Sequence, residues 1–68
     1  MEMQSNKDQL VFEYMNWEGK WGVRRVRPIK LWYGSTQWHQ EPGWLLKAMD
    51  LEKNAERDFA VKDIVRFR

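Results

Sequence analysis

The chain has to build a stable fold from 68 residues without a single cysteine. A domain of this length buries only about 60% of the surface that its unfolded chain exposes, so its core is small. Disulfides are excluded, and a structural zinc site has too few ligands because His39 is the only histidine. Five tryptophans, three phenylalanines and two tyrosines remain to supply buried area. We therefore expect one small domain that relies on large aromatic side chains and holds no metal or cofactor.

Alternating apolar and polar residues predict a mainly β fold. The expected strands are Leu10–Met15, Trp21–Tyr33, Trp44–Leu51 and Arg57–Val61, and the last residues form a helical turn or a fifth strand ending at Phe67. Loops rich in Asn and Gly separate them, and Asn54 suits a left-handed turn position. The third strand is apolar on both faces, so we expect it to be central, with Trp44 in the core.

The second expected strand is irregular. A strict period of two would place Arg25 and Arg27 on the face of Trp21 and Val23. A β-bulge or bend near residues 24–27 would remove this conflict, and Pro28 supports one because it cannot donate to a ladder. A sheet of four to five antiparallel strands with such a bend is expected to curl into a small SH3-like or Sm-like barrel over residues 9–68. Residues 1–8 lack periodicity and are expected to be a disordered tail.

Positive charge is concentrated in the middle of the chain. Residues 24–40 carry Arg24, Arg25, Arg27 and Lys30 and no acidic residue, whereas the whole chain has a net charge of only +2. Such a focus attracts an anionic partner. The alternative, held at equal weight, is a strand that turns its polar face to water.

Aromatic residues follow this basic stretch: Trp32, Tyr33, Trp38 and His39. Arginine side chains match phosphate groups, and aromatic faces stack on bases, so the pattern favours binding of nucleic acid or a nucleotide-like ligand. Trp38 stands in a ten-residue polar loop, which predicts a surface or pocket-lining position. Arg57 shares a strand face with Phe59, which indicates either a place in a pocket or an ion pair with Glu13, Asp50 or Glu52.

Other function classes have weaker support. Ser35, His39 and Glu41 could be imagined as a nucleophile, a base and an orienting acid, but no nucleophile-elbow pattern surrounds Ser35, so we expect no enzyme. The rival hypothesis is a protein-interaction or homodimerisation module that uses exposed aromatic residues. No apolar stretch approaches the length of a membrane span, so we expect a cytoplasmic protein without membrane contact.

Three segments together resemble the WYL domain of bacteria: Arg25-Val26-Arg27-Pro28-Ile29, Trp44-Leu45-Leu46-Lys47-Ala48-Met49-Asp50 and Arg57-Asp58-Phe59. The resemblance runs from about Val11 to Val65, nearly the whole chain. It implies an SH3-like or Sm-like barrel, a role as an effector-sensing module of transcriptional regulators, and nucleic acids or nucleotides as ligands. By this resemblance Arg57 lines the ligand groove.

Two features of the chain depart from that family pattern. Leu45 stands where the motif has Tyr, which removes a stacking ring and a hydroxyl. No segment before Leu10 is long enough for the helix-turn-helix that usually accompanies the domain. We therefore expect no sequence-specific DNA regulation by this chain alone, and a regulator protein is a further expected partner.

Overall fold

The computed structural model describes residues 9–68, so the predicted tail at 1–8 lies outside the described residues. Five strands make up most of this range: β1 (Leu10–Met15), β2 (Trp21–Gly34), β3 (Gly43–Asp50), β4 (Ala55–Ala60) and β5 (Ile64–Phe67). Within it, one 3-10 turn, η2 (Val61–Asp63), joins β4 to β5. The two structures that the sequence left open for the last residues, a helical turn and a fifth strand, are thus both present.

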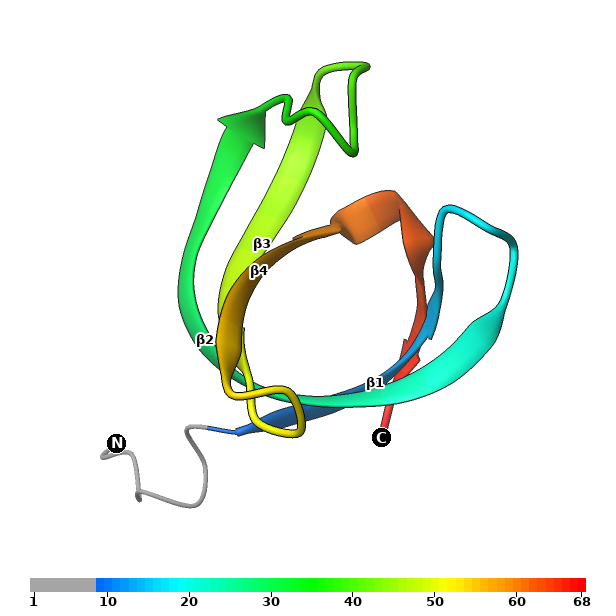
Figure 1. Cartoon of the computed structure of the whole chain (residues 1–68), viewed down its shortest axis with the longest axis vertical. Helices are drawn as coiled ribbons and strands as arrows, with labels where there is room; N and C mark the ends of the chain where they lie inside the picture. The colour runs from blue at the N-terminus through cyan, green and yellow to red at the C-terminus, as the bar shows by residue number, and fades with distance from the viewer. Residues whose placement is uncertain (1–8) are drawn as a thin grey trace.

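All five strands pair antiparallel in one sheet, in the order β4-β3-β2-β1-β5. The strands β1 to β4 follow one another as hairpins, and β5 returns to pair with β1. Figure 1 shows the sheet curling, so that β4 and η2 lie across from β1. The prediction of a mainly β fold with a central third strand is confirmed. The strands β4 and β5 are the two edges of the sheet, and no backbone ladder joins them within residues 9–68.

The irregularity in β2 lies later than predicted. Pro28 opposes Ala48 and Lys30 opposes Lys47, so Ile29 is an extra residue on β2. Residues 24–26 keep a regular register with β1 and residues 26–28 with β3, so the prediction of a bulge at residues 24–27 is wrong. The conflict that motivated it does not arise, because the face shared by Trp21, Val23, Arg25 and Arg27 is exposed. An exposed sheet face tolerates arginine between apolar residues.

The core lies on the concave face of the curled sheet and consists of phenylalanine, tyrosine and aliphatic side chains. Its buried members are Phe12, Tyr14, Val26, Leu46, Ala48 and Phe59. The rings of Phe12, Tyr14 and Phe59 meet edge to face, with centroids 5.1–6.0 Å apart. This geometry adds favourable quadrupole contacts to the area that the rings bury. The small core is therefore stabilised mainly by three interlocking rings.

The tryptophans contribute little to this core. Four of the five are exposed, and Trp32 is half-buried. The prediction that Trp44 is core is wrong, since its side chain is 55% exposed. Trp44 shares the face of Leu46, but it stands near the tip of the β2–β3 hairpin, which Figure 1 shows extending beyond the rest of the sheet. There it makes an edge-to-face contact with Tyr33, at 5.4 Å between centroids.

Candidate functional site

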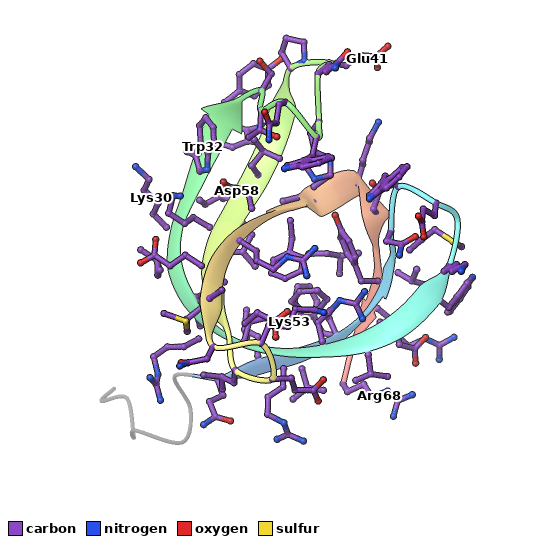
Figure 2. The ribbon with its side chains drawn as sticks, viewed as in Figure 1. Lys30, Trp32, Glu41, Lys53, Asp58 and Arg68 are labelled. Carbon is purple, nitrogen blue, oxygen red and sulfur yellow. The ribbon has the colours of Figure 1, made fainter. Side chains whose placement is uncertain are left out.

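The structure divides the predicted basic stretch between the two faces of the sheet. Arg25, Arg27 and Lys30 are exposed on the convex face. Figure 2 shows Lys30 and Trp32 pointing away from the interior of the curl. Because Lys30 opposes Lys47 across the ladder, like charges face each other at this point.

Trp32 has a structural partner on the same convex face. Its indole Nε1 donates a hydrogen bond to Asp58 Oδ1 at 2.9 Å, and Lys47 Nζ lies 3.6 Å from Asp58 Oδ2. The indole also covers Gly34, where an added Cβ would meet its ring. These contacts tie β2 to β4 across β3. Trp32 therefore belongs to the framework, and its ring is held against the sheet.

Two predicted arginines meet on the concave face. Arg24 opposes Phe12 in the β1–β2 register, and its guanidinium lies 5.9 Å from the centroid of the Tyr14 ring. The Arg57 guanidinium lies 5.6 Å from the centroid of Phe59. Residues far apart in the chain thus bring two cations over the aromatic core, a favourable placement of charge on ring faces.

One of these two arginines has a carboxylate partner. Asp50 is 1% exposed, and its Oδ2 lies 3.7 Å from Arg57 Nη1. Arg24 takes part in no ion pair among residues 9–68, and its buried Nε has no hydrogen-bond partner there. Arg24 is half-buried and its Nη1 donates a hydrogen bond to Val23 O at 3.4 Å, so its charge is accessible and would be neutralised by an anion supplied from outside. On the concave face Arg57 therefore has a carboxylate partner, and Arg24 has none among residues 9–68.

A cavity of about 480 Å³ opens beside Arg57, and we refer to it as the Arg57 cavity. Its lining residues come from β1, β4 and the two loops that flank β2: Tyr14, Asn16, Trp17, Thr36, Trp38, His39, Glu56, Arg57, Asp58 and Phe59. The structure thus brings three predicted site residues, Trp38, His39 and Arg57, to one place. Of the two positions predicted for Arg57, an ion pair and a pocket, the structure shows both.

Trp17 and Tyr14 are among the residues of the Arg57 cavity that sequence reasoning missed. A signal for Trp17 was available, because a large exposed aromatic residue in the short turn Asn16-Trp17-Glu18-Gly19 has no structural need to be there. Tyr14 gave no such signal, since an aromatic residue in an alternating strand is typical of a core. Tyr33 lies outside this site, next to Trp44 on the hairpin.

Tyr14 connects the core to the cavity. Its hydroxyl accepts a hydrogen bond from Ala60 N at 2.9 Å, which joins β1 to the end of β4. Burial raises the pKa of the Tyr14 phenol above its usual value, and the hydrogen bond from Ala60 opposes this shift only in part. The phenol therefore stays neutral at physiological pH and keeps its own proton for donation.

The pKa of Tyr14 predicts an alkaline loss of stability. A raised folded-state pKa gives stability that is present below about pH 10, the unfolded value, and lost as pH rises through the folded value. We expect urea midpoints to fall above about pH 10 and this decline to be weaker in Tyr14→Phe. Tyr33→Phe removes an exposed hydroxyl and is the matched control, in which the alkaline decline remains. An unchanged decline in Tyr14→Phe would contradict the assignment.

A second cavity, of about 710 Å³, lies between the loop at 35–42 and η2. It shares Trp17, Trp38 and His39 with the Arg57 cavity and extends to Leu45. Leu45, which stands at the tyrosine position of the family motif, is buried opposite Trp32 and Ala60. The charged residues that line this cavity are Glu41, Lys62 and Asp63, so no arginine lies in its wall.

Residues 9–68 contain no group of three or more His, Asp or Glu side chains that could hold a metal ion. Within that same range, no helix has the length and apolar character needed to cross a membrane. The chain matches no known family model, and no curated protein or solved structure is detectably similar to it.

Proposed function

We propose that the chain is a small regulatory module that senses a ligand, and that it binds nucleic acid or a nucleotide-like anion on its basic and aromatic surface. The observation that carries this proposal is the placement of the Arg24 and Arg57 guanidiniums over the aromatic core, where Asp50 pairs with Arg57 and no carboxylate among residues 9–68 pairs with Arg24. An anion would supply the missing charge. Guanidinium groups in a partly buried site bind phosphate through charge-assisted hydrogen bonds.

The surroundings of Arg57 support the same proposal. The Arg57 cavity has about 480 Å³, within the range of small-molecule sites, and two indoles and an imidazole line it. Aromatic faces next to an arginine suit a ligand that combines a ring with a phosphate. The acidic residues at its rim, Glu56 and Asp58, alternate with Arg57 along β4. Their side chains therefore point to the opposite face, where Asp58 bonds Trp32.

We further propose that the fold is an SH3-like or Sm-like barrel of the WYL type, acting in the bacterial cytoplasm without a cofactor and without enzymatic activity. The strand order and the 3-10 turn before β5 support the barrel, as does the bond from Ala60 N to the Tyr14 hydroxyl between the two arms of the curl. The three segments that resemble the family lie on adjacent strands β2, β3 and β4. In this assignment Arg57 has the ligand-facing role that the resemblance implies.

A second candidate function is a protein-interaction or homodimerisation module without nucleic-acid binding. It is favoured by exposed apolar residues on one face of the β2–β3 hairpin, Leu31, Tyr33 and Trp44. Exposed apolar clusters of this kind are typical of association surfaces. Concentration-dependent broadening of NMR signals at these residues, with no response to nucleotides, would favour this function over the first.

An NMR titration with nucleotides and short single-stranded DNA and RNA at low salt tests the first proposal. We expect shifts at Arg57, Trp17 and Trp38, and binding that weakens as salt is added. Arg57→Gln should weaken binding about tenfold or more, because it removes a charge-assisted contact. Arg27→Gln, the same charge change on the convex face, should have a much smaller effect. If none of these anions causes shifts, the proposal is overturned. Equal losses of affinity in Arg57→Gln and Arg27→Gln would overturn it as well.

A further inference from the structure

Trp17 and Trp38 stack on each other although they belong to different loops. Their ring centroids lie 6.4 Å apart with 27° between the ring planes. Both side chains remain exposed, at 68% and 65%, so burial of apolar area does not explain the pairing. Each ring borders both the Arg57 cavity and the second cavity. The pair therefore forms the wall between two open spaces.

The turn that presents Trp17 is well fixed. Asn16 Oδ1 accepts hydrogen bonds from the backbone amides of Glu18 and Lys20, both at 2.9 Å. The backbone of Asn16 bonds Lys20 and Gly19 as well, and Gly19 takes a φ of 81° that favours glycine. This short loop thus holds Trp17 at the end of the β1–β2 hairpin with little freedom in the backbone.

The turn that presents Trp38 is fixed in a similar way. Thr36 Oγ1 accepts hydrogen bonds from the amides of Trp38 and His39, at 3.1 and 3.0 Å. The backbones of Thr36 and His39 bond each other in both directions. Because hydrogen bonds between Thr36 and His39 fix this turn, the Trp38 indole is in position before a ligand binds. Preorganised aromatic groups lose little entropy on binding, which favours affinity.

Charge distinguishes the two spaces beside the tryptophan pair. The Arg57 cavity has a guanidinium in its wall, and its acidic lining residues Glu56 and Asp58 alternate with Arg57 and turn their side chains to the opposite face of β4. The Tyr14 hydroxyl, which accepts from Ala60 N, keeps a proton to donate. The second cavity has Glu41 and Asp63 against the single cation Lys62. An anionic group is therefore favoured on one side of the indoles only. A ring attached to that group would lie next to Trp17 and Trp38.

We infer that the Arg57 cavity takes a planar heteroaromatic ring joined to a phosphate, the chemistry of a nucleoside monophosphate, with the ring against the tryptophan pair and the phosphate at Arg57. This inference rests on the proposed anion binding and adds the requirement for a ring. The same chemistry is present in a free mononucleotide and in the terminal nucleotide of a single strand. Stacking on an indole is tolerant of the base, so the tryptophan pair selects for a flat ring and not for one sequence.

Comparing ligands with and without a ring tests this inference. The probes are AMP, ribose 5-phosphate and a 5′-phosphorylated tetradeoxyadenylate, followed by tryptophan fluorescence and NMR. Because base–indole stacking is worth about 1–3 kcal/mol, we expect AMP to bind about tenfold tighter than ribose 5-phosphate. Stacked indoles also give a paired circular dichroism signal, which AMP should change and ribose 5-phosphate should not. AMP binding as tightly as the oligonucleotide assigns the site to a free nucleotide, and tighter oligonucleotide binding assigns it to a strand end.

Matched variants separate this inference from the proposed function. Trp38→Leu should weaken AMP binding about tenfold and leave ribose 5-phosphate unchanged, whereas Trp38→Phe keeps an aromatic face and most of the affinity. Trp21→Leu removes an exposed indole outside both cavities and should have no effect. Equal affinity for AMP and ribose 5-phosphate would overturn the requirement for a ring and leave the proposed anion binding intact. Failure of every anion to bind would overturn both.

Discussion

Replacing Phe59 by alanine is expected to unfold a large share of the protein at 25 °C. Phe59 is 1% exposed and meets the rings of Phe12 and Tyr14 at 5.4 and 5.1 Å. Deleting a fully buried phenylalanine costs about 3–5 kcal/mol. A domain of this size has a total stability of about 3–10 kcal/mol, so the substitution removes from about a third of that stability to all of it. Urea denaturation followed by circular dichroism measures the loss.

Phe67→Ala is the matched control for this experiment. Phe67 also contacts Phe12, at 5.7 Å between centroids, but it is 58% exposed at the end of β5. The same atoms are deleted with much less burial lost, so we expect a cost of about 1 kcal/mol. Equal losses in the two variants would contradict the placement of the core, because they would mean that the ring cluster is not centred on Phe59.

The strands of this fold could be predicted because their signals are local. Alternation identified β1, β3 and β4 within a few residues, and Asn54 takes the left-handed conformation expected of it, with a φ of 55°. Residue types also identified Arg57 as the arginine on the face of Phe59. Each of these inferences depends on neighbours in the chain, whose geometry is set by the backbone alone.

The location of the tryptophans could not be predicted in the same way. Alternation gives the face of a residue but not how far along the curled sheet the core extends, so Trp44 was expected inside and lies outside. The candidate site could not be predicted for the same reason, because it depends on contacts between distant segments. Trp17 and Trp38 meet because two hairpins bring their loops together, and no local pattern encodes that contact. Alternation itself divides Arg24 from Arg25 between the two faces, but which face is concave depends on how the whole sheet curls.

Asp50→Ala is expected to be the most damaging polar substitution, and Asp50→Asn should cost much less. Asp50 Oδ1 accepts hydrogen bonds from the amides of Glu52 and Lys53, at 3.0 and 3.3 Å, and so holds the β3–β4 turn. Its Oδ2 is buried beside Arg57. Alanine removes both functions, at a cost of about 2–4 kcal/mol, whereas asparagine keeps an oxygen for the turn amides and loses only the charge. Urea denaturation of the two variants should show this order.

Loss of the Asp50 charge should at the same time strengthen anion binding. The carboxylate at 3.7 Å competes with any external anion for Arg57. Removing it frees the guanidinium and lowers the negative potential on the concave face, so we expect Asp50→Asn to bind AMP about tenfold tighter, about 1.4 kcal/mol. Glu52→Gln makes the same charge change on the exposed side of the turn and should alter affinity little. If the two variants bind AMP equally, the anion does not bind at Arg57, because charge alone and not position would then govern the affinity.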